Sequence, residues 1–486
     1  MALKADSKSI LGWLGANEKV FTEMSDQIWA KPETNWGEFF ASGLQADYLE
    51  KEGFRITRNP SDMKTAFIAE WGEGKPILAY IGEYDALPGL SQKTVPYREP
   101  VKEGAAGQGC GHNILGTAGV AAAVALKKWM QENQIAGTIR YYGCPAEEIG
   151  GGKVYFARDG YFDDLDAALS YHPAIYNMAS LFRTVAIISS TFYFKGRSAH
   201  AGSAPHMGRS ALDAVELMDV GANFMREHVK DGTRIQYVIK DGGQAPNIVP
   251  ETASVNYYLR AEKVDYLLEV AQWLSNISKG AALMTGTEVE EIFETGFACM
   301  IANKYLAGLT YEVMESVGPI EFTEEEIEYA QKINDKFPGE NADFIEARLE
   351  MLNAKDELAN MLRKYKDQPL LGANFPPLDG DVVFKGATDV GDLSQVAPTG
   401  AFWTACFPTC TPGHSWASTA TDGMSIGHKG LMHAARILAL TGAEMFTDHT
   451  HFEKAQAEFK EMMSGKTYQP LIPKDMKPPQ REPEDK

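Results

Sequence analysis

Short apolar runs separated by turn-rich segments characterise the first third of the chain. Residues 76–81 (PILAYI) form a continuous apolar run, and residues 138–142 and 167–171 are further strand-like runs. Such runs are typical of strands that are buried on both faces of a sheet. Residues 114–129 are rich in Ala and Leu and lack Pro, which predicts a helix with Asn113 as its N-cap. Strands that alternate with helices predict a largely parallel sheet and the α/β class.

The pattern changes near residue 183. Residues 185–188 and 191–194 are rich in β-branched and aromatic residues, and helical spacing follows from about 210 to 228 and from about 266 to 283. Strands with two helices between and after them predict a compact α+β domain with helices on one side of a sheet. We expect this domain to be inserted into the first, because His414, a candidate site residue, lies beyond it.

These patterns divide the chain into two domains and a tail. A length of 486 residues also exceeds what one hydrophobic core usually serves. The second part of the catalytic domain contains a charged helical insertion at about 301–367, which we interpret as a solvated surface feature. The predicted boundaries are 1–183 and 299–470 for the catalytic domain, 184–298 for the inserted domain, and 471–486 for a disordered tail.

Charge and apolar content exclude several classes of protein. The net charge is −20, from 46 basic and 66 acidic residues, which argues against binding to nucleic acid or to an anionic membrane. The N-terminus has no apolar core followed by a cleavage site, and no stretch approaches 18 apolar residues, so we expect a soluble, cytoplasmic protein. The five cysteines are an odd number in a long chain, which favours buried thiols over a disulfide framework.

Residue types that bind divalent metals recur close to the predicted strand ends. Thiolate, imidazole and carboxylate together suit a borderline-soft ion such as zinc, and an open α/β sheet builds its site at the carboxyl ends of its strands. Glu147 and Glu148 are adjacent in a strand-end loop, so one carboxylate can bind a metal while the other holds a water as a general base. These features predict a metal-dependent hydrolase. The candidate ligands are Cys110, His112, Glu148, His172 and His414.

The order of motifs resembles the di-metal aminoacylase/carboxypeptidase family of metallopeptidases, in its cysteine-containing amidohydrolase branch. The resemblance covers nearly the whole chain. The motifs that carry it are GEYDALPG (82–89), GCGHN (109–113), PAEE (145–148), YHP (171–173), KGRSAHAGSAPHMGRSALDAV (195–215), APNIVPETA (245–253), GATDVGD (386–392) and PGHSW (412–416).

The resemblance implies a role for each site residue. Glu147 would be the general base, and His200 would bind substrate or stabilise the oxyanion, in this family sometimes in the site of a dimer partner. Asn247 and Arg260 would contact the substrate carboxylate or the oxyanion. Many relatives carry a His-x-Asp metal motif where this chain has Glu83–Asp85, so Asp85 would orient a ligand rather than bind metal. The ligands of one or two Zn or Mn ions would be Cys110, His112, Glu148, His172 and His414.

The resemblance also implies a substrate class and a partner. We expect hydrolysis of an N-acyl or N-aroyl amino acid, with p-aminobenzoyl-glutamate as the leading candidate. The inserted domain would act as lid and dimerisation surface, in a homodimer or with a related subunit. Three alternatives stay open: a general aminoacylase or dipeptidase, a cysteine hydrolase that uses Cys110 with His172, and a non-catalytic subunit that completes a partner's site.

Overall fold

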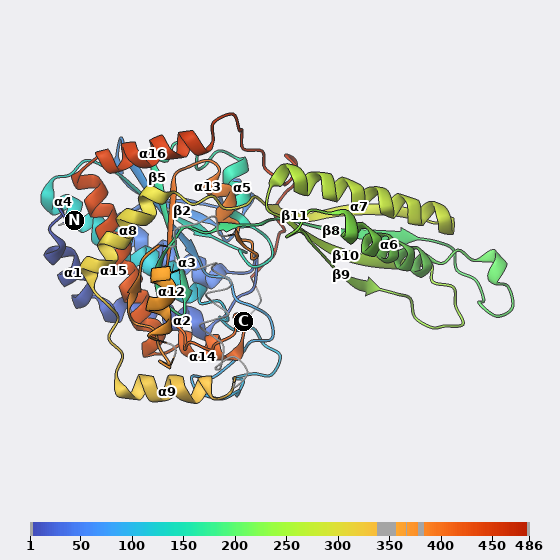
Figure 1. Ribbon diagram of the computed structural model, residues 1–486, viewed down its shortest axis with the longest axis horizontal. Helices are drawn as coiled ribbons and strands as arrows, with labels where there is room; N and C mark the ends of the chain where they lie inside the picture. The colour runs from blue at the N-terminus through green and yellow to red at the C-terminus, as the bar shows by residue number, and fades with distance from the viewer. Residues whose placement is uncertain (1–2, 338–355, 366, 378–382, 484–486) are drawn as a thin grey trace.

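A computed structural model of the protein describes residues 3–337, 356–365, 367–377 and 383–483. The chain forms a large α/β body and a narrower extension that projects from one side of it (Figure 1). The body holds both ends of the described chain, and the extension is built from the middle of the sequence, coloured green to yellow.

The body is organised around an eight-stranded sheet in the order β1-β2-β4-β3-β5-β14-β6-β12. Its centre is parallel, because β3 pairs in parallel with β4 and β5, and β5 pairs in parallel with β14. Every residue of β3 is buried, as its continuous apolar run predicts. The predicted, mainly parallel α/β architecture is thus confirmed. The strands are β1 (Arg55–Arg58), β2 (Phe67–Glu73), β3 (Ile77–Glu83), β4 (Gly137–Cys144), β5 (Ala167–Ala174), β6 (Asn177–Ser180), β12 (Asn374–Phe375) and β14 (Thr399–Ala405).

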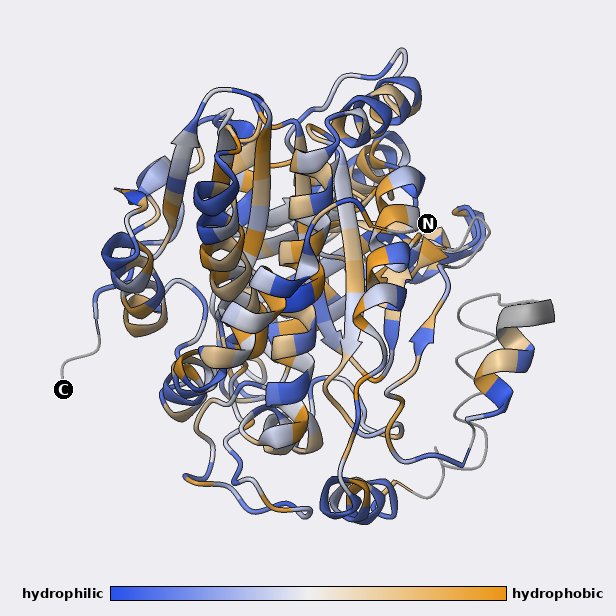
Figure 2. Ribbon diagram, turned by 90° about the vertical axis from the view of Figure 1, so that its left-hand side faces the viewer, coloured by the Kyte–Doolittle hydropathy of each residue, from blue (hydrophilic) through white to orange (hydrophobic). Residues whose placement is uncertain are grey.

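Helices cover both faces of this sheet, and each face has its own apolar core. Figure 2 shows the apolar strands enclosed by helices whose outer sides are hydrophilic. One face carries α5 (Gly152–Arg158) and α13 (Val390–Ser394). The larger core on the other face includes α1 (Ser7–Ala16), α2 (Glu18–Ala30), α3 (Phe39–Lys51), α4 (His112–Asn133), α8 (Lys304–Val317), α12 (Asp356–Arg363), α15 (Ser425–Thr447) and α16 (Thr450–Met462).

Helix α4 begins earlier than its Ala- and Leu-rich run indicates. Its N-cap is Gly111 with φ of 82°, and Asn113 is the second helical residue, so the prediction of Asn113 as N-cap is wrong. The Asn113 side chain instead donates a 2.9 Å hydrogen bond to Ser25 Oγ. A Cβ at Gly111 would lie 2.8 Å from Pro173 Cγ, so only glycine fits this left-handed turn against β5.

The extension contains a four-stranded antiparallel sheet in the order β11-β8-β10-β9. Helices α6 and α7 pack on one face of it, at the positions where the sequence predicts two helices. The catalytic and inserted domain boundaries at 183 and 298 remain predictions. The elements are β8 (Ala186–Lys195), α6 (Ala211–Met225), β9 (Arg234–Asp241), β10 (Thr252–Ala261), α7 (Val264–Thr285) and β11 (Glu288–Phe297).

Shorter elements lie around the junction of the two parts and at the edge of the body. Strand β7 lies between β6 and β8 in the chain and pairs in parallel with β13, which comes much later in the sequence. Among the described residues, none of the helices has the combination of length and apolar character that a bilayer span requires. The remaining elements are β7 (Arg183–Thr184), β13 (Val383–Phe384), α9 (Glu324–Asn334), α14 (Trp416–Asp422) and 3₁₀ turns at Pro60–Asp62, Pro205–Met207 and Arg226–His228.

Two further segments compare differently with the prediction: the charged stretch lies partly outside the described residues, and the tail contains a buried residue. The charged stretch at 301–367 contributes α8, α9 and α12, and its residues 338–355 and 366 lie outside the described residues. In the predicted disordered tail, Ile472 is buried in the core beside α5, and Arg158 Nη1 donates a 2.5 Å hydrogen bond to the Met476 carbonyl. The polar composition of the tail gave no sign of this contact. Ile472 and Pro478 are buried, whereas most other described residues from 473 to 483 are exposed.

Candidate metal centre and active site

The five predicted metal ligands converge at the edge of the large sheet where β3, β4 and β5 end. Cys110 and His112 lie at the start of α4, Glu148 follows β4, and His172 lies in β5. His414 comes from the turn before α14, although hundreds of residues separate it from the others in sequence. Their ligand atoms form two groups, each with atoms within 4.8 Å of one another, that share Cys110. The groups are Cys110, His112 and His172, and Cys110, Glu148 and His414.

The buried His112 and the half-buried His172 are each oriented by a hydrogen bond on the Nδ1 atom. His112 Nδ1 lies 2.9 Å from Asp85 Oδ1, and His172 Nδ1 lies 2.8 Å from the Pro173 carbonyl oxygen. A carbonyl or carboxylate oxygen accepts from N–H, so each Nδ1 carries a proton and each Nε2 is the ring nitrogen on the side of the cluster. The His172 Nε2 lies 3.4 Å from Cys110 Sγ. Asp85 thus contacts a candidate ligand and not the cluster centre, as a carboxylate that orients a metal-binding histidine does.

Several buried polar atoms at the cluster lack a hydrogen-bond partner among the described residues. They are Glu148 Oε1 and, facing each other 3.2 Å apart without a hydrogen bond of good geometry, His112 Nε2 and Glu83 Oε2. A buried polar atom without a partner costs about 1–3 kcal/mol, and these three are all electron-pair donors of the kinds that zinc and manganese accept. The residues present therefore fit a divalent cation.

Glu147 and Glu148 follow β4 in adjacent positions but belong to different parts of the cluster. Glu148 Oε2 lies 3.4 Å from His414 Nε2, whereas Glu147 groups with Glu83 and His112. Burial, followed by the negative charges of Glu83 and Glu148, raises the pKa of Glu147 well above its usual value. Glu147 is thus a carboxylate beside the ligands with an increased affinity for a proton.

Cys110 and His172 are close together but do not form an activated thiolate pair. Burial, followed by the charge of Glu148, raises the pKa of the Cys110 thiol. Burial, followed by the neighbouring His112, lowers the pKa of His172 to about 4. A cysteine nucleophile requires the opposite shifts, with a low thiol pKa beside a protonated imidazole. The electrostatics therefore favour the metal hypothesis over the cysteine hydrolase.

A buried lysine, which we did not predict from the sequence, anchors the other side of the cluster. Lys153 in α5 has a fully buried side chain and lies 2.7 Å from Glu83 Oε1 and 2.5 Å from Asp389 Oδ1. Although burial disfavours its charge, the carboxylates of Asp389 and Glu83 raise the pKa of Lys153. The only signal in the sequence was the position of this lysine immediately before the apolar run VYFA.

Two predicted substrate-binding residues lie far from this cluster in the single chain. His200 and Asn247 are exposed on loops beyond β8 and beyond β9, and neither lines the cavity at the cluster. Strand β8 separates them from it: Ile187 lines the cavity, and Lys195 at the other end of the strand lies roughly 26 Å further at about 3.3 Å per residue. Figure 1 shows the β8–α6 loop at the tip of the extension.

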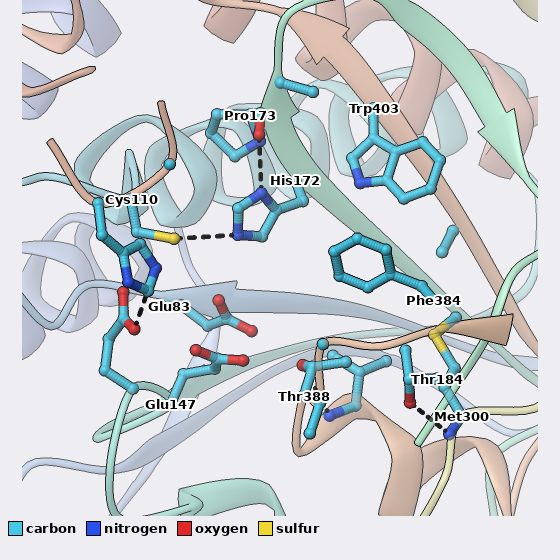
Figure 3. Close-up of a pocket in the computed structure, with 18 of the residues that line it drawn as sticks. Glu83, Cys110, Glu147, His172, Pro173, Thr184, Met300, Phe384, Thr388 and Trp403 are labelled. Atoms are coloured by element: carbon cyan, nitrogen blue, oxygen red, sulfur yellow. Dashed lines mark hydrogen bonds and ion pairs between the residues drawn. The ribbon is translucent and has the colours of Figure 1, made fainter. Parts of the chain in front are cut away.

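Arg260 differs from these two residues because it lines the cavity. It lies on β10 near the junction with the body, and its Nε lies 3.3 Å from Gln236 Oε1. The cavity has a volume of about 520 Å³ and reaches from Cys110, Glu147 and His172 to a group of aromatic rings (Figure 3). It is large enough for a small acyl amino acid.

Comparison with known proteins decides the family. Peptidase family M20/M25/M40 matches residues 79–346. The chain is also 38% identical over 465 residues to the B-type subunit of p-aminobenzoyl-glutamate hydrolase from Escherichia coli, a match that covers 95% of this chain and 96% of the relative. The chain belongs to peptidase family M20/M25/M40. It is a metal-dependent amidohydrolase, as the sequence predicts.

Other known proteins are similar to the chain over part of its sequence or in fold. The chain is 31% identical to Xaa-Arg dipeptidase of Mus musculus over 62% of its own length and 69% of the relative. The solved aminobenzoyl-glutamate utilization protein from Klebsiella pneumoniae has a TM-score of 0.56 and 17% identity, covering 86% of this chain and 97% of that one. The Bacillus subtilis YXEP protein, described as a dinuclear metal binding peptidase, has a TM-score of 0.56 and 15% identity, covering 89% and 99%.

Proposed function

We propose that this M20/M25/M40 peptidase hydrolyses the amide bond of N-aroyl and N-acyl amino acids, with p-aminobenzoyl-glutamate as its substrate. The observation that carries the reaction class is the cluster of five ligand side chains with Glu147 beside it at one cavity. The substrate is supported by the match, over nearly the full length of both chains, to a hydrolase of that compound.

In this proposal one or two divalent ions, zinc or manganese, are held by the two groups that share Cys110. A bound ion of this kind supplies Lewis-acid activation of water and of the amide carbonyl. Both metal-facing histidine nitrogens are oriented for it by Asp85 and the Pro173 carbonyl. Asp85 also accepts a 3.0 Å hydrogen bond from the Glu148 N–H, so one carboxylate fixes a ligand from each group.

Glu147 is the general base. It belongs to a ligand-atom group with His112 but is not needed to complete either group around Cys110. Its carboxylate removes the proton from water as the amide carbonyl is attacked, and returns it to the nitrogen of the departing amino acid. Positioned proton transfer of this type contributes about 10²–10⁴-fold to rate.

The substrate carboxylate is received by the lid. Arg260 presents a guanidinium to the cavity, and the described residues that line the cavity include no Lys and no other Arg. Guanidinium binds carboxylate through two parallel hydrogen bonds. The α-carboxylate of an acyl amino acid therefore pairs with Arg260, which places its amide bond toward the metal cluster.

His200 and Asn247 complete the site from a second protomer. Their exposure at the far end of the extension leaves them available to a neighbouring cavity, and His200 Nδ1 accepts 3.1 Å hydrogen bonds from the Gly202 and Ser203 N–H groups, which leaves Nε2 to act as a donor. The partner is a second copy of this chain or a related A-type subunit. The chain is 28% identical over 241 residues to the A-type subunit of p-aminobenzoyl-glutamate hydrolase from Escherichia coli, covering 46% of this chain and 54% of the relative.

The decisive experiment is to purify the chain alone, measure its metal content, and assay p-aminobenzoyl-glutamate beside N-acetyl amino acids and dipeptides. We expect bound Zn or Mn, loss of hydrolysis with a chelator, and recovery when the ion is restored. Activity that survives chelation but not thiol alkylation would show a cysteine hydrolase instead. Metal binding without hydrolysis until the related A-type chain is added would show a protein that is inactive alone.

A further inference from the structure

Aromatic side chains form one wall of the cavity beside the candidate metal centre. Phe182 and Trp403 have ring centroids 4.5 Å apart at an interplanar angle of 41°, and Phe182 and Phe384 lie 6.4 Å apart at 32°. Tyr176 meets the edge of Trp403 at 5.8 Å. All four line the cavity, and in Figure 3 Phe384 and Trp403 lie on the same side of it as His172.

Strand register connects this wall directly to the candidate metal centre. Trp403 in β14 is the parallel partner of His172 in β5. Partners in register point their side chains to the same face of a sheet, and neighbouring strands lie about 4.8 Å apart. The indole therefore stands one strand away from a candidate metal ligand, on the face where the amide bond of the substrate is held.

The charged side chains that line the cavity belong to two groups. Its acidic and basic members among the described residues are the candidate metal-centre groups Glu83, Glu147, Glu148, His172 and His414, together with Arg260 on the lid. The other lining side chains are neutral, and most are apolar or aromatic. A substrate held at the ligand cluster thus has one lid cation and a set of uncharged rings available to it within the same cavity.

We propose that Phe182, Phe384 and Trp403 form a subsite that binds the flat aromatic ring of the acyl group and sets the preference for aroyl over small aliphatic acyl amino acids. This inference rests on the proposed function. Phe384 is its most informative member, because its side chain is 38% exposed and belongs to the two-residue strand β13, whereas Phe182 is only 3% exposed and supports the core. Stacking rings prefer offset or tilted neighbours, which these three planes offer.

A binding measurement tests the subsite without depending on turnover. Benzoate and cyclohexanecarboxylate have the same carboxylate and nearly the same size, but only benzoate is flat and aromatic. Titration calorimetry of the full chain, with and without added zinc, should show benzoate binding about fivefold tighter or more. Phe384→Leu, which keeps an apolar side chain, should remove that preference. Equal affinity for both acids in the unaltered protein, or an unchanged preference in Phe384→Leu, overturns the proposal.

An activity measurement separates the subsite from the proposed function. The ratio of kcat/KM for p-aminobenzoyl-glutamate to that for N-acetyl-glutamate should fall about tenfold in Phe384→Ala, because the acyl ring of the first substrate then loses one of its ring contacts. Phe459→Ala, at a partly exposed phenylalanine of α16 outside the cavity, should leave the ratio unchanged. An unchanged ratio in Phe384→Ala overturns the subsite while the function stands. If the unaltered chain hydrolyses neither compound, the function fails and the benzoate titration still decides the subsite.

Discussion

The two sheets of this protein differ in which side chains they bury and which they expose to solvent. The eight-stranded sheet is covered on both faces, and at the ends of its parallel strands it buries an assembly of histidine, cysteine, glutamate, aspartate and lysine. The four-stranded sheet is covered on one face only, and its other face exposes Tyr193, Val238 and Ile292 to solvent.

This difference indicates where the chemistry and the recognition are located. Side chains that must be held to within fractions of an ångström stand on strands and helices buried from both sides, where packing fixes them. The exposed apolar side chains on the uncovered face of the extension have the character of a surface that meets another protein. His200 and Asn247 lie on adjacent loops of this second region, and in the proposed function they complete the site of a second protomer.

Removing the carboxylate of Glu147 should have the largest effect on activity. Glu147→Gln keeps the size of the side chain but cannot accept a proton, so we expect kcat to fall about 10²–10⁴-fold. Metal content measured by elemental analysis should stay the same, because Cys110 forms both ligand groups without Glu147. Glu103→Gln is the matched control, since that carboxylate is 81% exposed. A variant that loses its metal would show that Glu147 is a ligand.

Breaking the buried ion cluster should have the largest effect on stability. Lys153→Met leaves the carboxylates of Glu83 and Asp389 buried without their cation, which costs about 3–5 kcal/mol of unfolding free energy. Urea denaturation measures this loss. Lys332→Met removes an exposed lysine paired with Glu328 in α9 and should change the free energy by less than about 0.5 kcal/mol. Equal losses in the two variants would contradict the distinction between buried and exposed charge.

Mixing two inactive variants tests whether the extension serves a neighbouring site. His200→Ala should lower kcat by about 10²–10³-fold, as loss of one oxyanion donor does. If the partner is a second copy, mixing His200→Ala with Glu147→Gln after brief dissociation should restore roughly a quarter of normal activity, because half of the dimers then contain one intact site. The same mixture should stay inactive if His200 acts within its own chain.

Much of this arrangement could be predicted from sequence because the signals were local. Continuous apolar runs indicated β3 and β5, and helical spacing indicated α6 and α7. The five candidate ligands were selected because their residue types recur mostly at predicted strand ends, where parallel strands bring distant loops together. The grouping of His414 with Cys110 could not follow from spacing alone, and it depended on the order of family motifs.

The remainder depended on contacts that sequence does not encode locally. Lys153 looked like an ordinary lysine because nothing near it in sequence carries its partners, Glu83 and Asp389. The aromatic wall escaped notice for the same reason, since Phe182, Phe384 and Trp403 come from three separate strands or turns. Helix α4 starts earlier than predicted because the close approach of Gly111 to Pro173 determines the N-cap. The intrinsic preference of Asn113 for that position does not decide it.

The smallest expected effect concerns the two faces of the four-stranded sheet and uses one substitution at two neighbouring positions. Val255 in β10 is fully buried against α6 and α7, whereas Val238 in the adjacent strand β9 is 53% exposed. Val255→Thr places a hydroxyl in an apolar core and should cost about 1–3 kcal/mol. Val238→Thr should change the unfolding free energy by less than about 0.5 kcal/mol in the dilute, unassociated chain. A similar cost at both positions would mean that β9 is covered even in the single chain, and the contrast between the two sheets would then be lost.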